Sequence, residues 1–350
     1  MKEILVSTQQ PYSVKIGDHL LPTLGIEAKT VAKGTHAVIV SDSNVWPLYG
    51  EIARKVLSYS GFSVDFFVFP AGEVHKNGIT YLNLLNFLAE HRITRSDFLI
   101  ALGGGVVGDL CGFAAATYLR GVDYIQVPTT LLSMVDSSVG GKTAIDLPAG
   151  KNLAGAFYQP KLVLCDTSLL QTLPNDLFLD GCAEVIKYGI LFDKDLYHHL
   201  EINDVSFDKE YVITRCIELK RNVVQEDEFD HDQRQLLNLG HTFAHGIEKE
   251  SRYSISHGTA VAIGLCMAAR SSRQFGFCDE ETARQIQTLV SQFGLPTATS
   301  FSASALAGHA LSDKKRHNDQ ITMVLPSTIG CCRLHKFPVS DLENVMKAGV

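Results

Sequence analysis

The sequence predicts an α/β domain over residues 1–173, followed by a mainly α-helical domain over residues 174–350. Two observations indicate this division. Before Pro174, short apolar runs alternate with stretches of helical spacing, a pattern typical of βαβ units around a mostly parallel sheet. After Pro174, long helical stretches dominate and strand-like runs are rare. The length of 350 residues also exceeds what one ordinary hydrophobic core requires.

Four apolar runs in the first domain predict buried strands, each closed by a polar or glycine-containing turn. These runs are residues 37–40, 64–69, 98–102 and 124–127, and residues 49–60 and 79–91 between them have helical spacing. In the second domain we expect helices at residues 181–191, 211–225, 234–249, 257–275 and 280–293, and a strand at 321–325.

Composition excludes several classes of protein. The net charge is −7, from 31 basic and 38 acidic residues, and there is no basic tract, so we expect no nucleic acid partner and no anionic membrane. Eight scattered cysteines without a C-x-x-C pair indicate neither a disulfide framework nor a thiolate zinc site. The first residues lack a signal-peptide core, and the longest apolar stretch, Ala260–Ala269, is too short to span a bilayer. We therefore expect a soluble cytoplasmic protein.

Glycines follow the third predicted strand, in the sequence Gly103-Gly104-Gly105-Val106-Val107-Gly108-Asp109. A strand that ends in glycines and opens a helix lets backbone N–H groups approach a phosphate. The segment is neither a Walker loop nor a strict G-x-G-x-x-G motif, and a tight turn for helix–sheet packing is the alternative.

Two other strand ends also carry polar residues. Asp42 and Asn44 follow the first strand, and Thr129 and Thr130 follow the fourth. Each pair alone is compatible with capping or turn chemistry. The carboxyl ends of parallel strands meet at one edge of a sheet, where ligands bind, so together these residues favour a Rossmann-like site for a dinucleotide.

Four polar residues share one predicted helix in the second domain: Arg234, Asn238, His241 and His245, at i, i+4, i+7 and i+11. At 3.6 residues per turn they would project from one face. A solvated helix face is the alternative, but the absence of Glu and Lys from this stripe favours a functional site.

A metal site is a second prediction for this region. His241 and His245 have the spacing of two metal ligands, although the sequence lacks the Glu of an H-E-x-x-H motif. His257 opens the next predicted helix, and Glu184 lies on an apolar one. A carboxylate with two imidazoles is a standard open Zn²⁺ site, whereas an i, i+3 ion pair with Lys187 is the other interpretation of Glu184. Spacing alone does not choose between His245 and His257.

Several basic residues could form a local positive site, although the chain has a net negative charge. Two lie in predicted glycine-rich loops, and the others are on or beside the predicted helices: Lys142, Lys151, Lys187, Lys220, Arg234 and Lys314. A single lysine is usually a solvated surface group, but a cluster would bind a multiply charged anion. The residues alone therefore predict a dinucleotide, a metal and an anionic, phosphorylated polyol.

Specific motifs over nearly the whole chain resemble the 3-dehydroquinate synthase family. They are GGGVVGDLCGF, TYLRGV, VPTTLLSMVDSSVGGKTAID, GKNLAGAF, GCAEVIKYGIL, LNLGHTFAHGIE, SHGTAVAIG and Asp313-Lys314-Lys315. The resemblance implies a dehydroquinate synthase-like fold, with NAD and Zn²⁺ or Co²⁺ as cofactors. The family converts the anionic sugar phosphate 3-deoxy-D-arabino-heptulosonate 7-phosphate to 3-dehydroquinate and phosphate. Transient NAD-dependent oxidation, phosphate elimination, re-reduction and an intramolecular aldol step make up this reaction of the shikimate pathway.

The resemblance also assigns roles to individual residues. The implied metal ligands are Glu184, His241 and His257. Residues implied to bind NAD are Asp42, Asn44, Gly72, Glu73, Lys76, Gly104, Gly105, Val106, Val107, Gly108, Asp109, Thr129, Thr130, Lys142, Lys151 and the segment from Leu169 to Thr172. Residues implied to contact the substrate are Lys142, Lys151, Asn152, Lys187, Lys220, Arg234, Asn238, His245 and Lys314, with Asp136 near the nicotinamide.

Arg120 matches a residue that reaches the phosphate of a neighbouring subunit, which implies a homodimer. The chain departs from the family pattern at Thr259, where a Glu often follows His-Gly, and in the Glu73 turn, which reads Gly-Glu-Val-His-Lys-Asn.

Three other functions compete with this one. They are a sugar-phosphate cyclase with another substrate, a polyol dehydrogenase of the glycerol dehydrogenase type, and a non-catalytic NAD-binding protein. The retained set of Lys220, Arg234, Asn238 and Lys314 favours a substrate with a carboxylate.

Overall fold

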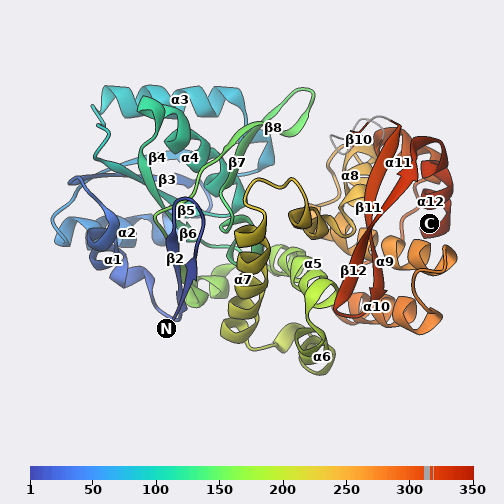
Figure 1. Cartoon of the computed structure of the whole chain (residues 1–350). Coiled ribbons are helices and arrows are strands. Elements are labelled where there is room, and N and C mark those ends of the chain that lie inside the picture. Colours follow the sequence, from blue (N-terminus) through green and yellow to red (C-terminus); the bar gives the residue numbers. More distant parts are fainter. Residues whose placement is uncertain (311–315, 318) are drawn as a thin grey trace. The chain divides into compact units, whose positions relative to one another are not determined.

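The computed structural model describes residues 1–310, 316–317 and 319–350, which form two units (Figure 1). Unit 1 comprises Met1–Leu173 and Lys209–Phe229, and unit 2 comprises Pro174–Asp208 and Asp230–Val350. The segment Lys209–Phe229, expected in the second domain, groups with unit 1 because its helix packs against the N-terminal strands. Lys314 lies outside the described residues. No helix in the described part of the chain is long and apolar enough to cross a membrane.

Unit 1 combines parallel strands with helices. Its helices are α1 (Leu24–Val31), α2 (Glu51–Tyr59), α3 (Gly78–Glu90), α4 (Gly105–Thr117) and α7 (Lys209–Glu226). Its strands are β1 (Lys2–Val6), β2 (Tyr12–Gly17), β3 (His36–Asp42), β4 (Ser63–Phe69), β5 (Phe98–Gly103), β6 (Asp123–Pro128), β7 (Lys142–Leu147), β8 (Gly150–Phe157) and β9 (Leu162–Asp166). The four predicted strands are confirmed as β3 to β6.

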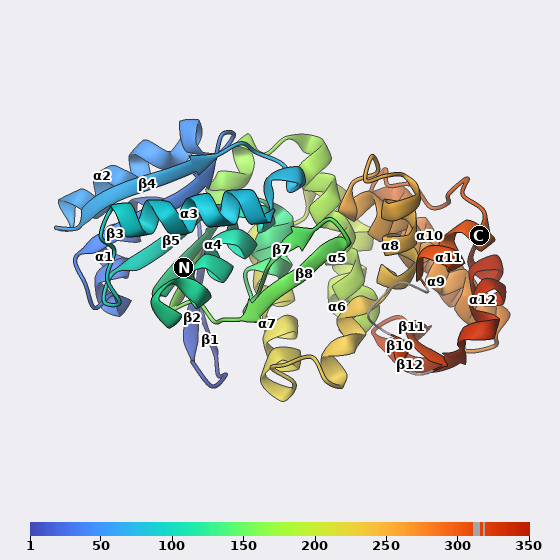
Figure 2. The same ribbon diagram turned by 90° about the horizontal axis from the view of Figure 1, so that it is seen from above.

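The main sheet of unit 1 has the strand order β1-β2-β9-β6-β5-β3-β4, and every neighbouring pair except β1–β2 is parallel. Figure 2 shows the part of this sheet that β5, β3 and β4 form. From β3 the chain runs outward to β4 and then returns to β5 on the other side of β3. The strand order therefore reverses between β3 and β5. In open α/β sheets, ligands bind outside the carboxyl ends of the strands at such a point.

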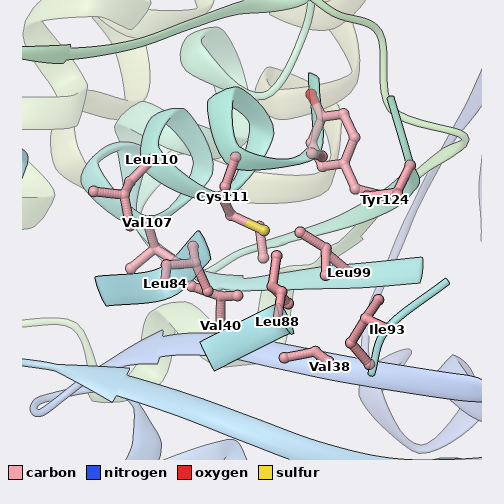
Figure 3. Packing of buried hydrophobic residues seen from close by; sticks show 14 of the residues in the cluster. Val38, Val40, Leu84, Leu88, Ile93, Leu99, Val107, Leu110, Cys111 and Tyr124 are labelled. Carbon is pink, nitrogen blue, oxygen red and sulfur yellow. The ribbon is translucent and has the colours of Figure 1, made fainter. Parts of the chain in front are cut away.

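Buried aliphatic side chains fix the position of α4 on this sheet. Val38 and Val40 of β3 and Leu99 of β5 point to one face, where they pack with Leu84 of α3 and Val107 of α4 (Figure 3). Helices α3 and α4 cover this face, and α1 and α2 cover the other (Figure 1). Successive strand residues alternate between the two faces, so continuous apolar strands fit a sheet covered on both sides.

The stretch that carries Lys142, Lys151 and Asn152 differs from its prediction. It forms an antiparallel hairpin of β7 and β8, whereas glycine-rich loops were expected. Gly140 and Gly141 do have positive φ, of 98° and 67°, but the next residues after Lys142 belong to β7, in which Thr143, Ala144 and Ile145 are all buried. The glycines in this stretch are typical of loops, so the strands β7 and β8 were not predicted.

Unit 2 is mainly helical, with a three-stranded antiparallel sheet of β10, β11 and β12. Its elements are α5 (Asn175–Phe192), α6 (Lys194–Asn203), α8 (His241–Glu250), α9 (His257–Gln274), α10 (Glu280–Gln292), α11 (Ala303–Ala310), β10 (Arg316–His317), β11 (Gln320–Thr328), β12 (Cys331–Pro338) and α12 (Leu342–Gly349).

The single helix predicted over residues 234–249 is wrong. A short 3-10 helix, Gln233–Asn238, ends at Leu239, whose ψ of 128° is extended. Gly240 then has a left-handed φ of 77°, and α8 begins only at His241. A Cβ at Gly240 would lie 2.9 Å from the backbone nitrogen of Leu265 in α9, so close packing and backbone conformation both require glycine there. The four polar residues therefore do not share one helix face.

Candidate active-site residues in the two units

Glu184, His241 and His257 come together in unit 2. Glu184 lies in the middle of α5, and the two histidines are the first residues of α8 and α9. The Glu184 Oε1 atom is 3.4 Å from His241 Nε2 and 3.2 Å from His257 Nε2. Among the described residues, this is the group of three potential ligands whose donor atoms all lie within 4.8 Å of one another.

The cluster fits a divalent metal ion. Bonds of about 2.0–2.1 Å in a tetrahedral site place neighbouring ligand atoms about 3.3 Å apart. The two distances from Glu184 Oε1 match this separation. Two imidazoles and one carboxylate leave a fourth position open, as in catalytic zinc sites.

Both imidazoles turn Nε2 toward Glu184. His241 Nδ1 donates a hydrogen bond to the carbonyl oxygen of Leu239, at 3.0 Å. His257 Nδ1 lies 3.6 Å from Glu248 Oε1, and Glu248 is only 3% exposed. Acceptors behind Nδ1 favour the tautomer with a lone pair on Nε2, which is the arrangement of many metal-binding histidines. Glu248 was not predicted from the sequence, although it lies seven residues, two helical turns, after His241.

The alternative interpretation of Glu184, an ion pair with Lys187, is also confirmed. Its Oε2 atom pairs with Lys187, and both side chains are about 1% exposed. Burial raises the pKa of Glu184, but Lys187 and the two imidazoles hold it well below its usual value. Burial lowers the pKa of His241 to about 4, whereas Glu184 and Glu248 outweigh burial and raise the pKa of His257 to about 10. The two carboxylate oxygens thus face different partners.

The other predicted residues of unit 2 lie on α8 or just before it. The His245 ring is perpendicular to that of His241, with 5.8 Å between ring centroids, but His245 is not part of the three-residue group. Arg234 is 1% exposed in the turn before Gly240. Asn238 donates from Nδ2 to the carbonyl oxygen of Gln235, at 3.1 Å.

In unit 1, the strand ends around the reversal of strand order carry the predicted dinucleotide residues. Asp42 ends β3, and its Oδ1 accepts from the backbone nitrogens of Asn44 and Val45, at 2.8 and 2.9 Å. The Thr129 nitrogen donates to the Gly103 carbonyl oxygen at 3.0 Å, which joins the ends of β6 and β5. These residues lie at the carboxyl edge of neighbouring strands, as predicted.

The glycines after β5 serve packing and also open the start of α4. A Cβ at Gly103 would meet Val107 at 2.5 Å, and one at Gly104 would meet Thr130 at 3.0 Å. Gly104 is the N-cap and offers no side-chain cap to α4. The first backbone N–H groups of α4 therefore point toward the strand ends, where helix starts favour anions.

A buried charge cluster surrounds Lys76, which is 4% exposed. Lys76 Nζ is 2.8 Å from Glu73 Oε1, 3.2 Å from Asp109 Oδ2 and 3.8 Å from Asp146 Oδ1. Burial raises the pKa of Asp109 to about 6, against the opposing charge of Lys76. Asp146 also accepts from the Asn152 nitrogen at 2.8 Å. Asp146 was not predicted, because its contact with Lys76 joins segments far apart in the chain.

The remaining predicted residues of unit 1 fall into two groups. Tyr49 Oη donates to the Leu169 carbonyl oxygen at 3.2 Å, which ties the segment after β9 to the turn after β3. Lys220 on α7 donates to the carbonyl oxygen of Asp136 at 2.7 Å and also pairs with its carboxylate. Lys220 therefore belongs to unit 1. Lys187, Arg234 and the metal-type cluster, which is Glu184, His241 and His257, belong to unit 2.

Arg120 lies apart from these residues. It follows the C-terminal end of α4, whereas Gly104 and Gly105 are at the N-terminal end. The 13 residues of α4 span about 20 Å, so Arg120 does not join the strand-end residues of its own chain.

The fold is shared with solved structures of two synthases. A solved structure of 2-deoxy-scyllo-inosose synthase complexed with carbaglucose-6-phosphate, NAD⁺ and Co²⁺ is 25% identical, with a TM-score of 0.90 over 100% of both chains. The 2-epi-5-epi-valiolone synthase of Streptomyces hygroscopicus, solved with NAD⁺ and Zn²⁺ bound, is 24% identical, with a TM-score of 0.88 over 96% of both chains.

Sequence comparison defines the family. The models of the N-terminal and C-terminal parts of 3-dehydroquinate synthase match residues 66–180 and 181–316. The curated 3-dehydroquinate synthase of Pelobacter propionicus is 44% identical over 332 residues, which cover 93% of this chain and 92% of the relative. The chain therefore belongs to the 3-dehydroquinate synthase family, and the resemblance seen in its motifs is confirmed.

Proposed function

We propose that this chain converts 3-deoxy-D-arabino-heptulosonate 7-phosphate to 3-dehydroquinate and phosphate, a carbon–oxygen lyase reaction of the shikimate pathway. NAD and Zn²⁺ or Co²⁺ are its cofactors. Family membership at 44% identity supports the reaction. The observation that carries the proposal is the cluster of Glu184, His241 and His257, whose spacing fits one divalent ion beside the buried Lys187.

Glu184, His241 and His257 would hold the metal. A divalent ion there supplies Lewis acidity toward the hydroxyl oxygens of a polyol. Lys187 orients Glu184 through Oε2 and leaves Oε1 to the imidazoles. The ammonium group also adds positive charge beside the cluster, which favours an anionic substrate.

A set of cations and polar groups would bind the substrate. The phosphate, carboxylate and hydroxyls are assigned to Lys142, Lys151, Asn152, Lys187, Lys220, Arg234, Asn238, His245 and Lys314, with Asp136 near the nicotinamide. Arg234 supports this assignment because a guanidinium that is 1% exposed is already desolvated, and such a group binds carboxylate or phosphate strongly.

The strand ends of unit 1 would bind NAD. Asp42 lies where a carboxylate accepts from ribose hydroxyls, and the uncapped start of α4 suits the pyrophosphate. Unit 1 would therefore bind the dinucleotide, and unit 2 would hold the metal and supply part of the set that binds the substrate.

The enzyme is proposed to act as a homodimer in the cytoplasm. Arg120 supports the dimer because it is exposed and lies at the far end of α4 from the strand-end residues. Free cysteines at all eight positions agree with a reducing compartment.

One assay tests the reaction. The purified chain is mixed with the heptulosonate phosphate, catalytic NAD⁺ and Zn²⁺ or Co²⁺, and phosphate and 3-dehydroquinate are followed together. We expect equal amounts of both products without net NADH. His241→Ala should abolish the metal-dependent activity and leave NAD binding largely intact. Accumulation of NADH would indicate a polyol dehydrogenase instead, and silence with both metals would reject the proposed substrate.

A different sugar phosphate is the second candidate substrate. The solved relative complexed with carbaglucose-6-phosphate has the same fold and favours this alternative. Glucose 6-phosphate in the same assay separates the two. Phosphate release from glucose 6-phosphate, and none from the heptulosonate, would establish the alternative.

A further inference from the structure

Thr259, where this chain departs from the family pattern, makes a defined contact with α5. Its backbone nitrogen donates to Asp180 Oδ1 at 3.0 Å. Ser256 donates from Oγ to the same oxygen at 2.6 Å and lies 2.8 Å from Thr259 Oγ1. Ser256 is the N-cap of α9 but makes no side-chain cap bond of its own. The cap of α9 therefore comes from a neighbouring helix.

The hydrogen bonds of this cap lie on both sides of His257, a residue of the metal-type cluster. His257 lies between Ser256 and Thr259, so bonds on both sides of it end on one carboxylate oxygen. Asp180 precedes Glu184 by four residues on α5, which places both carboxylates on the same side of that helix. The distance between Glu184 and the His257 backbone is thus fixed through Asp180.

Close backbone packing reinforces the contact. A Cβ at Gly258 would lie 2.2 Å from the carbonyl oxygen of Asp180 and 2.4 Å from its Cα atom. Helices α5 and α9 therefore touch at the residue that follows His257. A small change at Asp180 is transmitted directly to the start of α9.

We propose that Asp180 is a positioning residue of the metal centre, which caps α9 from α5 and so holds His257 Nε2 at 3.2 Å from Glu184 Oε1. The inference rests on the proposed function, because it requires that a divalent ion binds Glu184, His241 and His257. Residues that orient metal ligands typically change metal affinity by about 10–100-fold when they are removed.

The test measures zinc affinity rather than catalysis. The full chain is freed of metal, and its Zn²⁺ affinity is measured by competition with a chelating indicator. Asp180→Ala should weaken Zn²⁺ binding by about 10–100-fold. Asp180→Asn should remain within about threefold of the unaltered chain, because Asn caps a helix as well as Asp does.

Asp279 provides a matched control. It is the N-cap residue of α10, with Oδ1 accepting from the Thr282 nitrogen at 2.8 Å, and α10 carries no residue of the cluster. Asp279→Ala should lower the melting temperature about as much as Asp180→Ala does, without a change in Zn²⁺ affinity.

The outcomes distinguish the positioning role of Asp180 from the proposed metal-dependent function. If the unaltered chain binds Zn²⁺ and Asp180→Ala binds it equally well, the positioning role is wrong and the metal centre stands. If the unaltered chain binds no Zn²⁺, the proposed function fails and the positioning role with it. Should Asp180→Ala not fold, Ser256→Ala decides, since it removes the 2.6 Å bond at an exposed position. Unchanged Zn²⁺ affinity in Ser256→Ala would then overturn the inference.

Discussion

Lys187→Met should destabilise unit 2 strongly when metal is absent and only weakly when Zn²⁺ is bound. Lys187 and Glu184 are each about 1% exposed, and Lys187 pairs with Glu184 Oε2. Methionine fills a similar volume but carries no charge. In the metal-free chain the substitution therefore leaves the Glu184 carboxylate buried without its ammonium partner.

The magnitude follows from the burial of this pair. Breaking a buried ion pair by removing one partner costs about 3–5 kcal/mol, because the remaining charge stays desolvated. His241 and His257 lie within 3.4 Å of the other carboxylate oxygen and offset part of this cost, which favours the lower end of the range. A bound dication would replace the lost positive charge, so Zn²⁺ should reduce the loss to about 1–2 kcal/mol.

Hydrogen exchange of the α5 amides is the appropriate assay. Two units need not unfold together, and a single unfolding midpoint would mix their transitions. Lys347→Met is the matched control, because Lys347 pairs with Glu343 on α12 of the same unit but is 61% exposed. That exposed pair should contribute about 0.5 kcal/mol or less. A loss below about 1 kcal/mol in metal-free Lys187→Met, or the same loss with and without Zn²⁺, would refute the reasoning.

Three further changes have expected outcomes. Burial raises the pKa of Asp109 to about 6, so the folded state holds this proton more tightly than the unfolded state and unit 1 loses about 2 kcal/mol of stability as the pH rises from 4 to 6. Asp109→Asn should remove that loss in urea unfolding at the two pH values, and an unchanged pH dependence would contradict it. Asp146→Ala removes the acceptor of the Asn152 nitrogen and should speed amide exchange in β7 and β8, since one hydrogen bond contributes about 1 kcal/mol or less. Equal exchange rates would show that the hairpin does not depend on this bond. Gly258→Ala places a methyl group 2.2 Å from the Asp180 carbonyl oxygen and should cost about 1–3 kcal/mol, measured as a lower melting temperature of unit 2.

The parallel sheet was predictable because its inner strands β3, β5 and β6 are buried on both faces, and the edge strand β4 still has a mostly apolar sequence. Such strands are continuous apolar runs, and β3 to β6 all appear in the sequence as runs closed by a turn. The hairpin of β7 and β8 was not predictable in the same way. Four of the eight residues from Gly150 to Phe157 are only partly buried and four are exposed, so no buried apolar run marks that strand.

The helix error at Gly240 has a different cause. Helical spacing continues without interruption from Arg234 to Lys249 in the sequence, and one internal glycine costs a helix only about 1 kcal/mol. The structure breaks the helix because α9 packs so closely on Gly240 that a side chain there would meet the Leu265 backbone. This contact joins residues 25 positions apart, and a local pattern does not contain it.

The local sequence pattern did not decide whether His245 or His257 is the third residue of the cluster, because here too the deciding contact joins segments far apart in the chain. His245 is one turn from His241 and satisfies the local spacing, whereas His257 belongs to another helix. Glu184 decides between them, because its helix touches α9 at Gly258 and thereby brings the first residue of α9 to the carboxylate. A glycine directly after the histidine was the available signal, since two helix backbones approach this closely only where a side chain is missing. Helix contacts, rather than spacing along one helix, therefore assemble this site, and substitutions at the contact should change metal affinity even though they touch no ligand atom.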